Sequence, residues 1–121
     1  MRESEIILKC RTIFENLGWE VRTEEVFEIG PCNPFRYDIV LRHNGEVYGF
    51  VEVISSEDLV DKAKTIKVLL DTVVTQMKPR VFVITNGYTY DVYLKEKLYG
   101  SLTVPPSPEL VDIVLGGEDN E

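Results

Sequence analysis

The chain has 121 residues, of which 44% are hydrophobic and 28% charged, and its formal net charge is -8. This length suits one domain with its own core. The acidic excess argues against nucleic-acid binding by overall charge, so any DNA contact would need a local basic patch or a metal bridge.

The two cysteines, Cys10 and Cys32, have neither the spacing of a zinc site nor the number expected of a disulfide framework. The sequence also has no apolar stretch long enough for a signal peptide or a membrane span. We therefore expect a cytoplasmic protein, with residues 1–116 as a single domain and residues 117–121 as a frayed acidic tail.

The first predicted element is a helix over residues 3–17, where apolar residues recur at helical spacing and Gly18 follows as a C-terminal cap. On this helix Glu3 projects onto the apolar stripe, which is an unusual place for an acid. Residues 19–29 are expected to form one or two short extended pieces, and a loop rich in glycine and proline follows.

Residues 36–54 (RYDIVLRHNGEVYGFVEVI) predict a hairpin, and its register decides whether Asp38 and Glu52 can meet. A two-residue turn in a regular ladder would place them on opposite faces. A three-residue loop with a bulge at Gly45 would place them on one face, at diagonal positions. We expect the longer loop, because it also gives a wholly apolar opposite face, made of Ile39, Leu41, Val47, Gly49, Val51 and Val53.

The rest of the chain predicts a long helix over residues 57–77, a buried strand over 80–85, a turn at Asn86-Gly87 and a strand over 89–97. A last helix should begin after Ser107 and run to about Leu115. Strands interrupted by a helix favour an α/β fold in which a mixed sheet is flanked by helices.

Asp38 and Glu52 on one face have two interpretations. Mg²⁺ takes oxygen ligands and is commonly held by one or two carboxylates together with substrate phosphate, so the pair could be a metal site. Alternatively, each acid is neutralised by a nearby base. Arg36 would lie directly opposite Glu52 in the preferred register, which leaves an ion pair open.

The segment RYDIVLRHNGEVYGFVEVIS resembles the Asp, hairpin, Glu-x-Lys core of the PD-(D/E)XK nucleases. The helix that follows it, with PRVFVITNGYTYDVY, resembles the N-terminal nuclease domain of type I restriction enzyme motor subunits. The resemblance implies a restriction-endonuclease-like α/β fold in which Asp38 and Glu52 hold Mg²⁺ or Mn²⁺. It also implies Glu3 as a further ligand, and the backbone carbonyl of Val53 is another candidate.

The sequence departs from this family at the lysine two residues after the glutamate, which is Ile54 here. Lys62 or Lys67, on the helix that follows, could reach the gap instead, although both could equally be a solvated helix edge. The local positive charge from which we expect DNA contacts comes from Lys62, Lys64, Lys67, Lys78 and Arg80.

Two functions follow from these features. The first is a Mg²⁺-dependent DNA endonuclease of restriction-modification type, acting with a protein partner that supplies DNA binding or motor activity. The second is a catalytically inactive nuclease-fold module that binds nucleic acid or protein. The carboxylates favour the first, whereas Ile54 and the acidic composition favour the second. A homodimer is left open.

Overall fold

The structure is a computed structural model that describes residues 2–28, 34–54, 79–95 and 97–116. The expected helix over residues 57–77 lies outside these ranges. The described elements are, in chain order, α1 (Glu3–Asn16), β1 (Glu20–Glu28), β2 (Pro34–His43), β3 (Glu46–Val53), β4 (Val81–Thr85), β5 (Tyr90–Leu94), β6 (Lys97–Leu102) and α3 (Pro108–Gly116).

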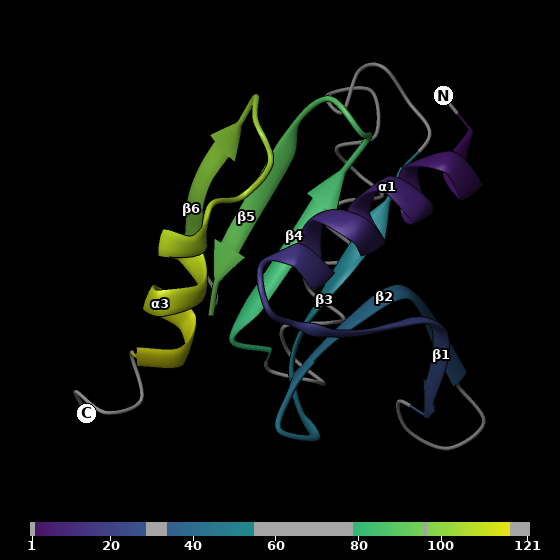
Figure 1. The fold of residues 1–121 in the computed structure, drawn as a ribbon. Helices are drawn as coiled ribbons and strands as arrows, with labels where there is room; N and C mark the ends of the chain where they lie inside the picture. Colours follow the sequence, from purple (N-terminus) through teal and green to yellow (C-terminus); the bar gives the residue numbers. More distant parts are fainter. Residues whose placement is uncertain (1, 29–33, 55–78, 96, 117–121) are drawn as a thin grey trace.

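The strands form one mixed sheet in the order β1-β2-β3-β4-β5-β6 (Figure 1). Neighbouring strands are antiparallel except β3 and β4, which are parallel. A parallel pair needs a crossover connection, and the chain between β3 and β4 is long enough to supply one. The predicted class, an α/β restriction-endonuclease-like mixed sheet flanked by helices, is confirmed.

Helices α1 and α3 cover the same face of this sheet (Figure 1). The apolar stripe of α1 buries Ile6, Cys10 and Phe14 against strand residues such as Val51 and Val83, as the helical spacing predicted. Leu110 and Val114 of α3 pack into the same cluster. Among the described residues, the larger of the two apolar clusters therefore lies on the α1 face.

A second apolar cluster of described residues lies on the opposite face of the sheet. It is built from the central strands and contains Tyr37, Val40, Phe50, Ile54, Phe82 and Ile84. The rings of Tyr37 and Phe50 stack within it, with centroids 3.9 Å apart. The alternation of strand side chains thus gives β3 two buried faces, which explains why most of this strand is apolar.

The β2–β3 hairpin differs from the expected three-residue loop. Asn44 and Gly45 both have positive φ, 52° and 79°, and His43 pairs with Glu46, so the turn has two residues of type I′. The register then shifts by one between Leu41 and Arg42 through a β-bulge, and Ile39 pairs with Val51 beyond it. The bulge therefore brings Asp38 and Glu52 to one face, which the longer loop was expected to do.

The bulge also changes which side chains share a face near the turn. Strand alternation in the expected register would place Tyr48 on the face of Glu52, but it packs in the α1 cluster, where its ring contacts Trp19. Val47 was expected on the α1 face, but it packs against the second cluster. The predicted faces are therefore wrong on the turn side of the bulge, whereas Ile39, Val51 and Val53 lie as predicted.

The predicted strand over residues 89–97 is two strands, β5 and β6. Lys95 has a φ of 57°, a left-handed conformation that turns the chain back, and β6 then pairs antiparallel with β5. A lysine is not a usual residue for such a turn, so the reversal of the chain at Lys95 was not predictable from sequence.

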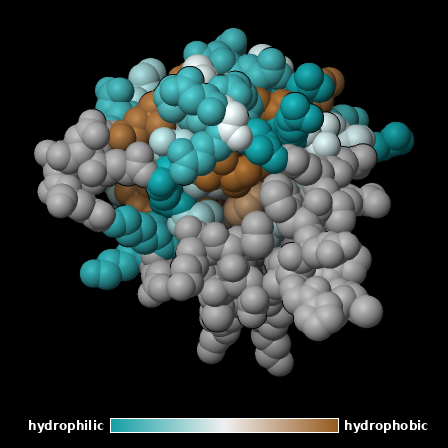
Figure 2. Space-filling view, turned by 90° about the horizontal axis from the view of Figure 1, so that it is seen from below, coloured by the Kyte–Doolittle hydropathy of each residue, from teal (hydrophilic) through white to brown (hydrophobic). Residues whose placement is uncertain are grey.

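One face of the molecule shows mostly hydrophilic residues among the described ones (Figure 2). Seen from below, it shows separate hydrophobic areas between hydrophilic ones (Figure 2). Separate apolar side chains are normal on a protein surface. No helix among the described residues is both long and apolar enough to cross a membrane.

Candidate functional site

Asp38 and Glu52 meet where the β2–β3 ladder ends. They lie one residue beyond the Ile39–Val51 pair, so they face each other directly instead of diagonally. The amide of Asp38 donates a hydrogen bond to Glu52 Oε1 at 3.2 Å, and the amide of Val53 donates one to Asp38 Oδ2 at 2.8 Å. The two carboxyl groups are thus held side by side by the amides of the two strands.

Glu52 is a buried acid, with 8% of its surface exposed. Burial raises its pKa to about 8, and the negative charges of Asp38 and Glu3 add to this, while the amide hydrogen bond from Asp38 opposes it. Near neutral pH, and without a cation, Glu52 therefore carries a proton. A cation between the two carboxyl groups would favour its loss.

Tyr37 precedes Asp38 and lines the same site. Its ring lies fully buried on Phe50. Burial raises the pKa of its hydroxyl well above the ordinary value, and the negative charge of Glu52 raises it further. Tyr37 therefore stays neutral and helps to keep the surroundings of Glu52 apolar, a role that the sequence pattern did not single out.

Ile54 occupies the position at which the PD-(D/E)XK nucleases that the sequence resembles have a lysine. Its side chain is buried with 9% exposed and belongs to the second cluster, and its amide donates to the carbonyl of Thr85 at 2.9 Å. By strand alternation Ile54 lies on the same face as Glu52. An apolar group therefore stands beside the carboxyl pair where a cation was expected.

Glu3 lies in the first turn of α1, exposed to solvent, and its charge acts on Glu52. The role of Glu3 as a ligand stays a prediction. Val53, the other candidate, adjoins the pair through its amide. Among the described residues no group of three or more His, Cys, Asp or Glu side chains is arranged to hold a metal ion, so a cation would need water or substrate oxygens as well.

The expected place of Arg36 is wrong. In the observed register Asp38, and not Arg36, lies opposite Glu52, and Arg36 pairs with Val26 of β1. The ion-pair interpretation therefore loses the geometry on which it was based. Two charged groups among the described residues shift the pKa of Glu52, and both are acids, Asp38 and Glu3.

The predicted basic residues fall into two groups. Lys62, Lys64, Lys67 and Lys78 lie outside the described residues. Arg80 lies beside Tyr48, because its amide donates to the Tyr48 carbonyl and its guanidinium sits 4.2 Å from the ring centroid. Its Nη2 is also 3.4 Å from Glu46 Oε1. Tyr48, which Arg80 contacts, lies roughly 13 Å from Glu52 along β3, because the two are four residues apart on the strand.

The turn after β4 has hydrogen bonds that its Asn-Gly pair did not predict. Asn86 Oδ1 accepts hydrogen bonds from the amides of Tyr88 and Thr89, both at 2.9 Å. Lys9 of α1 donates from Nζ to the Gly87 carbonyl at 2.9 Å. Thr85, which begins this turn, pairs with Val53. The contact from Lys9 has no sequence signal, because it joins residues far apart in the chain.

Comparison with known proteins gives a fold and no sequence family. No protein-family model matches the chain, and no curated protein matches it. Among solved structures, a chain of a DrdV–DNA complex determined by cryo-electron microscopy matches with a TM-score of 0.67 and 13% identity. The match covers 94% of this chain and 11% of the other, so this chain spans about a tenth of that length. At this identity the likeness shows the fold alone.

Proposed function

We propose that this chain is a Mg²⁺- or Mn²⁺-dependent DNA endonuclease that hydrolyses phosphodiester bonds at Asp38 and Glu52. The observation that supports this most is the facing pair of carboxyl groups, one of them buried with a pKa of about 8. Two acids placed together in a buried site cost free energy unless a proton or a cation separates their charges.

The residues present fit a hard divalent cation. Asp38 and Glu52 would hold it, and Glu3 and the Val53 carbonyl are further candidates. When bound, such a cation supplies Lewis-acid stabilisation of the phosphate and a lower pKa for an attacking water. The amides of Val53 and Asp38 orient the two carboxyl groups, and Glu52 would release its proton as the cation binds.

In this proposal another residue has to supply the positive charge that a lysine carries in the PD-(D/E)XK nucleases. Ile54 can neither carry a charge nor donate from its side chain. Lys62 and Lys67 are the residues that the helical pattern offers for this task. Lys64 and Lys78 would add phosphate contacts, with Arg80 as a more distant one.

DNA is the substrate that the resemblance to restriction nucleases suggests. The similarity to a chain of a DrdV–DNA complex supports the same choice, since that structure is a complex with DNA. The acidic composition makes extensive DNA binding by this chain alone unfavourable. We therefore propose a protein partner that supplies DNA binding or motor activity.

Cleavage of supercoiled plasmid DNA tests this function. The wild-type chain should nick the plasmid with Mg²⁺ or Mn²⁺ and not with EDTA. Asp38→Ala and Glu52→Ala should each lower the rate by at least about a hundredfold, because each removes a ligand of the same ion. Asp112→Ala, at an exposed acid of α3, is the matched control and should leave the rate unchanged. Cleavage that survives both site substitutions would refute the proposal.

A second function is favoured by Ile54 and the net charge of -8. In this alternative the chain keeps the fold as a binding module and does not hydrolyse DNA. It predicts no cleavage with either metal ion, together with binding to DNA or a protein that Asp38→Ala leaves unchanged.

A further inference from the structure

Arg22 of β1 is an exposed cation that the sequence pattern did not single out. It pairs with Val40 of β2, and Val40 belongs to the apolar cluster on the side of Glu52. Its neighbour Val21 packs against the other cluster, beneath α1. Because successive strand residues point to opposite faces, Arg22 lies on the face of Glu52.

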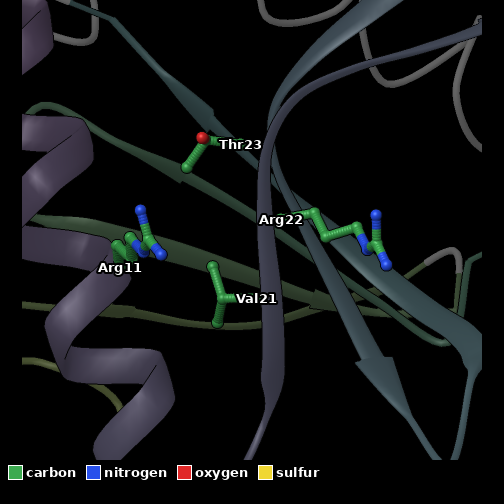
Figure 3. A pocket seen from close by; sticks show the side chains of 4 residues that line it. All are labelled: Arg11, Val21, Arg22 and Thr23. Carbon is green, nitrogen blue, oxygen red and sulfur yellow. The ribbon is translucent and has the colours of Figure 1, made fainter.

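A close view agrees with this placement. Val21 points toward α1, whereas the guanidinium of Arg22 extends on the other side of β1 (Figure 3). Arg11, from α1, ends on the Val21 side (Figure 3). The two arginines therefore flank β1 from opposite faces, although both line an open cleft of about 340 Å³ together with Val21 and Thr23.

Arg22 is also close enough to the carboxyl pair to share a ligand with it. Asp38 is two residues before Val40 on the strand next to β1. Two residues of strand rise and one strand spacing separate the Cα atoms of Arg22 and Asp38 by roughly 8 Å. An extended arginine side chain can span this separation to a phosphate group held beside Asp38.

The chemistry of Arg22 suits this task. A guanidinium remains charged at all physiological pH values and binds two phosphate oxygens at once. Ile54 leaves the carboxyl face without the cation that the family lysine would supply. On a chain with a net charge of -8, an arginine on this face would add positive charge where an incoming phosphate meets the two carboxyl groups.

We propose that Arg22 binds a DNA phosphate at the Asp38–Glu52 face and so supplies part of the positive charge that Ile54 does not. The proposal rests on the proposed function for its choice of DNA as ligand. It assigns to β1 a direct part in substrate binding, in addition to its part in the sheet.

The test is binding of a short fluorescein-labelled DNA duplex, measured by fluorescence anisotropy in Ca²⁺, together with plasmid cleavage in Mg²⁺. Arg22→Ala should weaken binding about tenfold and lower the slope of log Kd against log salt by about 1. Arg22→Lys keeps the charge and should lose less. Arg11→Ala is the matched control, because it removes the same charge on the α1 face, where Arg11 pairs with Glu15 at 2.8 Å.

The inference is overturned if Arg22→Ala binds the duplex with the affinity and salt slope of the wild type, or if Arg11→Ala is equally impaired. A wild type that does not bind the duplex overturns it as well. If Asp38→Ala abolishes cleavage while Arg22→Ala behaves as wild type, the nuclease function stands and the Arg22 inference fails. If the wild type never cleaves DNA but Arg22→Ala alone weakens binding, the Arg22 inference stands and the nuclease function fails.

Discussion

The buried carboxyl group of Glu52 links the stability of the fold to pH. Its pKa is about 8 in the folded chain, against an ordinary value of 4.5 for a glutamate. Between these two values the folded chain holds a proton that the unfolded chain has lost. The contribution of Glu52 to the free energy of unfolding therefore falls as the pH rises through this window, by at most about 1.4 kcal/mol per pH unit.

Replacing this carboxyl group by a neutral amide should remove that dependence. Glu52→Gln should be more stable than the wild type at pH 8 and should approach it near pH 4.5, because the glutamine has no proton to lose. Urea unfolding across this range measures the difference. Asp112→Asn, at an exposed acid of α3, is the control. A constant difference between wild type and Glu52→Gln over the whole range would show that the pKa of Glu52 is not raised.

Ile54 gives a second prediction at the level of residues. Ile54→Lys places an ammonium group beside the two carboxyl groups, so the proposed DNA cleavage should become at least about tenfold faster. Loss of the buried isoleucine should cost about 1–3 kcal/mol of stability. Ile54→Met is the matched control, since its unbranched side chain lacks the charge. A lysine variant no faster than the methionine variant in plasmid cleavage would contradict a need for this cation.

The residues of the site were partly predictable from sequence. Asp38 and Glu52 were found because one face of the hairpin had to be apolar, and the structure brings them together. The raised pKa of Glu52 was not predictable, since it depends on burial in the folded chain and on the nearby charge of Asp38. Arg22 was missed because its face is fixed only by pairing with β2.

Among the elements, the β2–β3 hairpin shows how a correct conclusion followed from a wrong loop. The expected three-residue loop and the observed two-residue turn with a bulge both bring Asp38 and Glu52 to one face. The hydrophobic pattern indicates that both side chains lie on one face. It does not distinguish a longer loop from a two-residue turn with a β-bulge. Tyr48 and Val47 were therefore misplaced, because they lie between the turn and the bulge.

The parallel contact of β3 with β4 gives a prediction at the level of elements. Gly49 pairs with Val81, and a Cβ at Gly49 would overlap the carbonyl oxygen and Cγ1 of Val81. Gly49→Ala should therefore lower the free energy of unfolding by at least about 2 kcal/mol, since the two strands must move apart. Thermal unfolding followed by circular dichroism measures this loss.

Gly100 of β6 provides the matched control for this substitution. The nearest atom to an added Cβ there is Leu102 Cδ2 at 3.7 Å, which is an ordinary contact. Gly100→Ala should change stability by no more than about 0.5 kcal/mol. Equal effects of the two alanines would mean that Gly49 is not required for the approach of β3 to β4.

For the whole molecule, the pattern of strands and helices was enough to predict the α/β class. The mixed sheet follows from a hairpin, a long crossover and a buried strand, and the similarity to a chain of a DrdV–DNA complex shows the same fold. The sixth strand was not predicted, because the turn before it is made by Lys95 in a left-handed conformation. Long-range contacts such as that of Lys9 with Gly87 were equally beyond the sequence.

The central claim is that Asp38 and Glu52 form a single cation site, and calorimetric titration with Mn²⁺ at pH 7 tests it most directly. The wild type should bind with the release of close to one proton, measured by repeating the titration in buffers of different ionisation enthalpy, because Glu52 has a pKa of about 8. Asp38→Asn should lose binding. No Mn²⁺ binding by the wild type, or equal binding by Asp38→Asn, would contradict the claim.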